Sequence, residues 1–101
     1  MSKTHQREEA LDAIAGELRN ESFSSLRKLS EKLELAVVRF RESEAAGGEV
    51  MLQCRAAAAE ALWKVIVQRE AMGFGRHDYV YSAYGVPPVI VALMGPQKKR
   101  A

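Results

Sequence analysis

The stretch Leu26-Arg-Lys-Leu29-Ser-Glu-Lys-Leu33-Glu-Leu-Ala36-Val-Val-Arg-Phe40 decides the fold of this 101-residue chain. Its residues Leu26, Leu29, Leu33, Ala36 and Phe40 recur at steps of three and four positions. Because one turn of an α-helix takes about 3.6 residues, these side chains share a single apolar stripe. Such a stripe needs cover from another helix, of the same chain or of a second copy. The stretch therefore predicts helix-on-helix packing and supplies five candidate interface residues.

The composition is typical of a single helical domain that spans residues 1–101. Apolar residues make up 48% and charged residues 28% of the chain, a balance found in folded globular proteins. Aromatic residues account for only 7%, so the core has to come mostly from Leu, Ala, Val and Met, which suits close-packed helices. We expect the ends, residues 1–4 and 96–101, to be disordered tails.

Capping residues and glycines mark the bounds of three longer helices. Thr4 is the expected N-cap of the first helix, and a bend or cap is expected near Asn20 to Ser24. The second helix is expected from Ser22 or Ser24 to Glu44, before Gly47-Gly48 turns the chain. The third, from about Glu49 to Met72, is apolar over a face wider than one seam, so we expect cover on more than one side.

The C-terminal segment has start and stop signals for two short helices. Gly73 suits the left-handed position that ends the third helix, and Asp78 is the expected cap of a helix over residues 78–84. Pro87 or Pro88 then opens a last helix that ends at Met94. Alternating tyrosines and a Val-Ile-Val run also fit a β-hairpin, so this alternative stays open over residues 79–94.

These elements predict an all-α fold. Its centre is a long antiparallel hairpin of the second and third helices, with the short N-terminal helix and a compact C-terminal helical segment packed against it. The stripe over residues 26–40 and the apolar face of Met51–Met72 present more surface than the rest of the chain comfortably covers. We therefore expect a homodimer in which two hairpins form a four-helix core.

Three stretches of the chain show a family likeness. They are Glu60-Ala-Leu-Trp-Lys-Val-Ile-Val-Gln-Arg-Glu-Ala-Met-Gly73, Tyr84-Gly-Val-Pro-Pro-Val89 and Met94-Gly95. They fall within residues 60–95, which make up about a third of the sequence. In these stretches the chain resembles short helical proteins of unknown function found in bacteria. The resemblance implies no activity, ligand or site.

The residue types that carry catalysis or bind metals form no recognisable site. Cys54 lies on the apolar face of its helix, where it is expected to be a small core residue. His77 stands beside Asp78 without a nucleophile motif, and adjacent residues at a helix start do not usually face each other. His5 is close to the terminus, and two histidines and one cysteine lack the spacing of metal ligands. We expect no catalytic, cofactor-binding or metal-binding residues.

One cluster has the chemistry of a recognition surface. Its members are Phe74, Arg76, His77, Tyr79, Tyr81 and Tyr84. Tyr and Arg are favoured at interfaces because they combine apolar area with directed hydrogen bonds. The same aromatic rings could instead close the open end of the helical bundle. The sequence leaves both interpretations open.

The net charge of +2 is concentrated at the C-terminal end. Lys98, Lys99 and Arg100 supply three of the 15 basic residues, so the rest of the chain holds 12 basic and 13 acidic residues. Such a body does not attract polyanions strongly. No apolar run resembles a secretory signal or a membrane span, and a single cysteine suits a reducing compartment, so we expect a cytoplasmic protein.

The preferred function is a non-enzymatic interaction or structural module that acts through helix packing, as a homodimer or with an unidentified protein partner. Two alternatives remain open. A nucleic-acid-associated regulator would use residues 78–84 and 88–94 as a helix-turn-helix-like pair, together with the Lys98–Arg100 tail. A small-ligand binder or an enzyme would need a pocket at the tyrosine cluster and His77.

Overall fold

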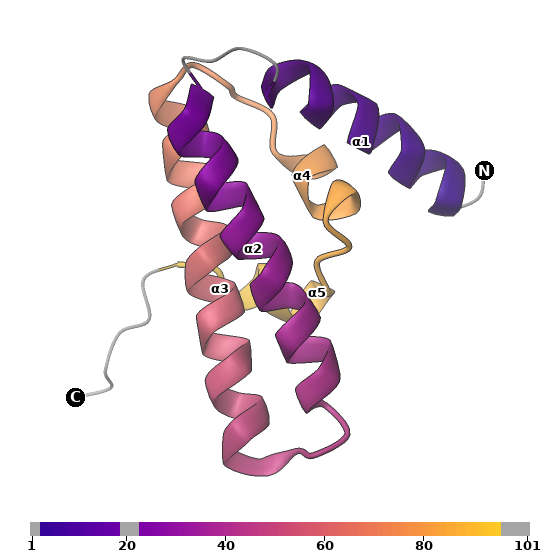
Figure 1. Ribbon diagram of the computed structural model, residues 1–101, viewed down its shortest axis with the longest axis vertical. Coiled ribbons are helices and arrows are strands. Elements are labelled where there is room, and N and C mark those ends of the chain that lie inside the picture. The colour runs from indigo at the N-terminus through magenta and orange to yellow at the C-terminus, as the bar shows by residue number, and fades with distance from the viewer. Residues whose placement is uncertain (1–2, 19–22, 96–101) are drawn as a thin grey trace.

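A computed structural model describes residues 3–18 and 23–95, which form five α-helices (Figure 1). They are α1 (Lys3–Leu18), α2 (Ser24–Ser43), α3 (Gly48–Ala71), α4 (Asp78–Ala83) and α5 (Pro88–Leu93). The predicted all-α class is confirmed. The β-hairpin alternative for residues 79–94 is wrong, because each of its two halves is helical.

Helices α2 and α3 lie side by side and run in opposite directions, joined by a short turn (Figure 1). The turn closes where the amide of Gly47 donates to the carbonyl oxygen of Ser43 at 3.0 Å. Gly47 and Gly48 have φ angles of +64° and +60°, which residues with a Cβ rarely adopt. The turn predicted from this glycine pair is confirmed.

A Schellman motif ends α3. The amide of Phe74 donates to the carbonyl oxygen of Arg69 at 2.9 Å, and that of Gly73 donates to Glu70 at 3.1 Å. Gly73 takes a φ of +93°, as its predicted role requires. The same pair of hydrogen bonds closes α4, with Gly85 in the left-handed position. Both motifs turn the chain sharply, which lets two short helices fold back onto the longer ones.

Helix α3 is covered by α2 on one side and by α5 on another, so the prediction of cover on more than one side is confirmed. Helix α1 packs chiefly on α4 and more lightly on α2. The buried apolar side chains of all five helices form one core. It consists of Ala10, Ile14, Leu26, Leu33, Val37, Phe40, Ala58, Ala59, Leu62, Val65, Ile66, Val80, Ala83, Val86 and Ile90.

Two predicted helix starts are wrong. α1 begins at Lys3, so Thr4 lies inside the helix, and both residues belong to it rather than to a disordered tail. α4 begins at Asp78 without a side-chain cap, because the Asp78 carboxylate pairs with Arg76 instead. Most of the bend or cap predicted near Asn20 to Ser24 lies outside the described residues, because these exclude residues 19–22, and so do the predicted tail residues 1–2 and 96–101.

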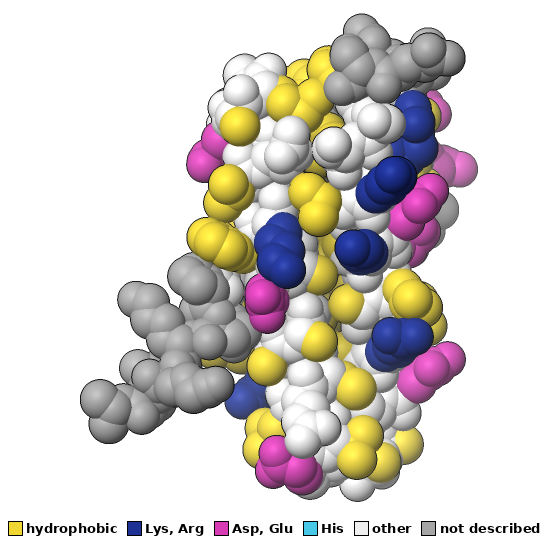
Figure 2. Space-filling view, turned by 60° about the vertical axis from the view of Figure 1, so that its left-hand side comes forward, with side chains coloured by type: hydrophobic (Ala, Val, Ile, Leu, Met, Phe, Trp, Pro, Cys, Tyr) yellow, Lys and Arg dark blue, Asp and Glu magenta, His cyan; other side chains and the backbone are white. Residues whose placement is uncertain are grey.

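Helices α2 and α3 also keep apolar side chains on the surface. Leu35 on α2 is 49% exposed, and Val67 on α3 is 43% exposed. Figure 2 shows one side of this helix pair, where apolar side chains lie among charged side chains of both signs. The chain's own helices therefore leave part of the apolar surface of the pair uncovered.

Burial along α3 predicts unequal effects of two leucine substitutions. Leu62 is 0% exposed and Leu52 is 41% exposed. Leu62→Ala should lower the free energy of unfolding by about 2–5 kcal/mol, because it removes buried apolar area and leaves a cavity. Leu52→Ala should cost less than about 1 kcal/mol. Urea unfolding followed by circular dichroism measures both, and equal losses would contradict this packing.

Candidate functional site

The last turn of α3 carries a charged residue into the protein interior. Arg69 is 1% exposed and continues the buried face that holds Leu62, Val65 and Ile66. Residues separated by three, four and seven positions share one side of a helix, so Arg69 faces inward with them. A buried guanidinium is unfavourable unless hydrogen bonds replace its hydration. The surroundings of Arg69 therefore have to supply acceptors.

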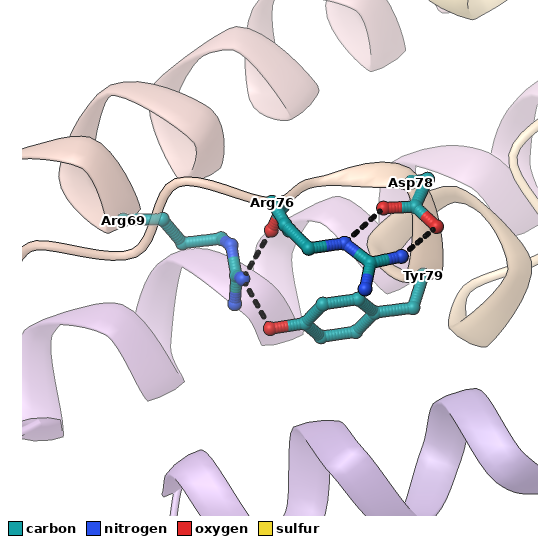
Figure 3. Close-up of polar contacts among 4 residues, drawn as sticks. All are labelled: Arg69, Arg76, Asp78 and Tyr79. Atoms are coloured by element: carbon teal, nitrogen blue, oxygen red, sulfur yellow. Dashed lines mark hydrogen bonds and ion pairs between the residues drawn. The ribbon is translucent and has the colours of Figure 1, made fainter.

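The acceptors come from the loop that follows α3 and from the start of α4 (Figure 3). Nη2 of Arg69 donates to the carbonyl oxygen of Arg76 and to the hydroxyl oxygen of Tyr79, each at 2.7 Å. The Nε group donates to Nδ1 of His77 at 3.3 Å. The rings of Phe74 and Tyr79 have their centroids 4.9 Å from Cζ, which is cation–π distance. One side chain thus holds residues 74–79 against the end of α3.

His77 takes part in this arrangement through both ring nitrogens. Because Nδ1 accepts a hydrogen bond from Arg69, the ring proton lies on Nε2, which donates to Oε2 of Glu70 at 3.3 Å. The His77 side chain is 15% exposed. Its neighbour Asp78 has a different partner, as expected for adjacent residues at a helix start. The contacts of His77 are those of a residue that positions a loop.

Arg76 and Asp78 form an exposed ion pair at the start of α4 (Figure 3). The guanidinium donates to both carboxylate oxygens, from Nη2 at 2.9 Å and from Nε at 3.3 Å. The hydrogen bond from Arg76 lowers the pKa of Asp78 below its usual 3.8. The pair stabilises the fold above the pKa of the unfolded state and loses this effect as pH falls through the lowered value. Because the side chains are 78% and 66% exposed, the contribution is small.

The six predicted recognition residues do not form one surface. Phe74, Arg76 and Tyr79 line an open groove of about 750 Å³ between α1 and the segment from Gly73 to Ser82. Tyr81 lines an adjoining groove of about 450 Å³, which shares Gln6 and Ser82 with the first. The other two residues, His77 and Tyr84, line neither of these grooves.

The aromatic residues of the cluster also close the fold. All four, Phe74, Tyr79, Tyr81 and Tyr84, pack against the core. The ring of Phe74 meets that of Phe23 edge to face, with centroids 5.6 Å apart at 81°. This contact joins the loop after α3 to the start of α2. The four aromatic residues therefore act as a core cap, and three of them, Phe74, Tyr79 and Tyr81, also line a groove.

The predicted interface stripe on α2 is mostly covered by the chain itself. Leu26, Leu33 and Phe40 are at most 2% exposed and belong to the core. They are unavailable to a partner unless the protein opens, which corrects their assignment as interface residues. Leu29 and Ala36 are half-buried, and both line hollows on the outer side of the helix pair.

These hollows adjoin each other between α2 and α3, because Lys32 and Ala57 line both of them, and the two together are called the groove between α2 and α3. Their volumes are about 170 and 280 Å³. Small or apolar residues line the groove: Leu29, Leu35, Ala36, Cys54, Ala57 and Ala61. Its basic residues are Lys32, Arg39 and Lys64, and its acidic residue among the described part of the chain is Glu60, which pairs with Lys64 at 3.5 Å.

The candidate reactive residues have ordinary surroundings. The sequence predicts that Cys54 is a core residue. It packs against the core but is only half-buried, so part of its side chain reaches the surface. The side chain of His5 lies outside the described residues. Within the part that the structure describes, no three His, Cys, Asp or Glu side chains gather into a possible metal site.

Comparisons with models of known protein families, with curated proteins and with solved structures give no match to this chain. None of the helices in residues 3–18 and 23–95 combines the length and the apolar character needed to cross a membrane.

Several residues of these sites were not identified from the sequence. Arg69 was detectable, because its spacing from Leu62 and Ile66 places it on the apolar face of α3. Nothing in the sequence indicates that Lys32 and Arg39 line a groove, because both lie on α2 and the facing side of the groove belongs to α3. The pairing of α2 with α3 had to be known to place them on one groove.

Replacement of Arg69 should destabilise the protein far more than replacement of a nearby exposed arginine. Arg69→Met loses three hydrogen bonds to the loop and should lower the free energy of unfolding by about 2–4 kcal/mol. Arg76→Met removes only an exposed ion pair and should cost less than about 1 kcal/mol. Urea unfolding and the side-chain chemical shifts of Tyr79 and His77 report both changes. Similar stabilities of the two variants would show that Arg69 does not hold the loop.

Proposed function

We propose that this protein is a non-enzymatic interaction module whose groove between α2 and α3 binds an acidic amphipathic helix of a partner protein. The observation that supports this most directly is the combination of a small, apolar floor with basic residues at the edges of the groove. Helices that dock into grooves place an apolar face on such a floor and charged residues at its rim.

The spacing of the lining residues suits a helix as occupant. On α2 they include positions 29, 32, 36 and 39, and on α3 positions 54, 57, 61 and 64, each three or four residues from the next; Leu35, Gln53 and Glu60 lie beside them on the same helices. The groove therefore follows both helix axes over about 15 Å, which matches a partner helix of about ten residues. Ala36, Ala57 and Ala61 let the backbone of a third helix approach closely.

The charges favour an acidic partner over a second copy of this chain. Lys32, Arg39 and Lys64 line the groove, and Glu60 offsets only the last of them. Two copies joined through this groove would bring their basic residues together, and like charges at an interface are unfavourable. The predicted homodimer also relied on the stripe at Leu26, Leu33 and Phe40, which the monomer covers.

The two alternative functions receive less support. Neither α4 nor α5 contains a Lys or Arg residue, so this pair of helices offers no cation to a nucleic-acid backbone. The Lys98–Arg100 tail lies outside the described residues. An enzyme or small-ligand binder would need the tyrosine cluster in one pocket, but Tyr79 and Tyr81 line two adjoining grooves and Tyr84 lines neither.

A synthetic peptide can test the groove directly. An amphipathic helix with a Leu/Ala face flanked by Glu should bind the protein in fluorescence anisotropy, and raised salt should weaken it. Ala57→Glu, at an exposed position inside the groove, should weaken binding at least about tenfold because it adds an acid and bulk. Ala92→Glu, at an exposed position on α5, is the matched control and should have no effect.

Three results would overturn the proposal. Equal binding of a peptide with Lys in place of Glu would remove the role of charge. Equal behaviour of the Ala57→Glu and Ala92→Glu variants would place the peptide elsewhere. A dimer mass in light scattering across a dilution series, abolished by Ala57→Glu, would assign the groove to a second copy of the chain.

A further inference from the structure

The groove that Tyr81 lines opens where α1, α2 and the turn between α4 and α5 meet. Its volume is about 450 Å³. Side chains with hydrogen-bond donors line it from three elements: Gln6 and Arg7 of α1, Arg41 of α2, and Tyr81 and Ser82 of α4. Gly85, Val86, Pro87 and Pro88 complete the lining. The groove thus combines several donors with an apolar wall.

Two guanidinium groups converge in this groove. A Cβ atom placed on Gly85 would lie 3.6 Å from Nη1 of Arg7 and 3.7 Å from Nη2 of Arg41. Arg41 also donates a hydrogen bond from Nη2 to the carbonyl oxygen of Gly85. The positive φ of Gly85, +59°, is what the turn requires of this residue. The Schellman motif at the end of α4 therefore sets the place where the two arginines meet.

The positive charge in this groove has no counter-charge in the described part of the chain. The described lining residues include no Asp or Glu. Neither Arg7 nor Arg41 forms an ion pair with a carboxylate within residues 3–18 and 23–95. Two like charges held close together repel each other, and an anion bound between them offsets this repulsion because both cations attract it. The arrangement is that of a site for an anion.

We propose that this groove binds the phosphate group of a small phosphate monoester. Two guanidinium forks, two hydroxyl groups and one amide supply donors from different directions, which suits a tetrahedral dianion with several acceptor oxygens. A carboxylate has one charge and a planar pair of oxygens, so it uses fewer of these donors. Val86, Pro87 and Pro88 offer apolar contact to the organic part of the ligand. This proposal is independent of helix binding between α2 and α3.

Nuclear magnetic resonance titrations of the isotope-labelled full chain test the site at constant ionic strength. Inorganic phosphate and phenyl phosphate are the probes, and acetate is the carboxylate comparison. We expect saturable shifts of the amides of Tyr81, Ser82 and Gly85, with phenyl phosphate binding more tightly than inorganic phosphate. Acetate should bind about tenfold more weakly or not at all.

Two arginine variants separate a built site from general attraction. Arg7→Gln should weaken phenyl phosphate about tenfold, because it removes a charged donor. Its fold should be unchanged, since the Arg7 side chain makes no hydrogen bond or ion pair within the described residues. Arg39→Gln removes the same charge from α2 but belongs to the groove between α2 and α3, so it should leave the affinity unchanged.

Four outcomes would overturn the proposal. They are the absence of saturable shifts at these amides, an equal loss of affinity in Arg39→Gln and Arg7→Gln, equal binding of acetate, and tighter binding of a short single-stranded oligonucleotide than of phenyl phosphate at the same amides. The last result would assign the groove to a phosphodiester backbone instead of a small monoester.

Discussion

Arg69 brings a positive charge into the interior where α3 ends, and the C-terminal third of the fold is arranged around it. Its donors reach the carbonyl oxygen of Arg76, the hydroxyl of Tyr79 and the ring of His77. These acceptors lie on residues 76–79, where the loop enters α4. The guanidinium restrains this segment, and its burial is tolerable only because the loop surrounds it. Loop and charge therefore depend on each other.

The position of the loop follows from the way α3 ends. The Schellman motif at Gly73 reverses the chain within two residues and returns Phe74 to the Arg69 side of the helix. A second motif at Gly85 directs Pro88 into the first turn of α5, which then packs on α3. Two glycines with positive φ thus decide how two six-residue helices, too short to be stable alone, are held on the longer ones.

Much of this architecture could be predicted from the sequence, because the residues that begin and end its helices act locally. Gly47-Gly48, Gly73 and Pro88 act through their own backbone conformations, so they mark the same boundaries in the chain and in the fold. The cap expected at Asp78 is absent, because its formation depends on which partner the side chain meets. A capping residue competes for partners, and Asp78 found Arg76.

The candidate sites were less predictable because they depend on contacts between helices. Arg7 and Arg41 belong to different helices and meet only after α4 has folded back to place Gly85 between them. The groove lined by Lys32 and Lys64 likewise exists only once α2 and α3 are paired. In contrast, the burial of Leu33 and Phe40 was evident from their spacing, although whether the cover came from this chain or another was not.

Helix α1 is attached to the rest of the protein mainly through α4. Since α4 is itself a single short helix, the two should detach together, as one cooperative unit of lower opening free energy than the α2, α3 and α5 assembly. Their amide protons would then exchange with solvent through a shared sub-global opening. Arg7 and Arg41 stand on opposite sides of that seam. An anion bound by both arginines would be released when α1 and α4 detach from the rest. Raising its concentration would therefore slow the exchange of the amide protons of α1.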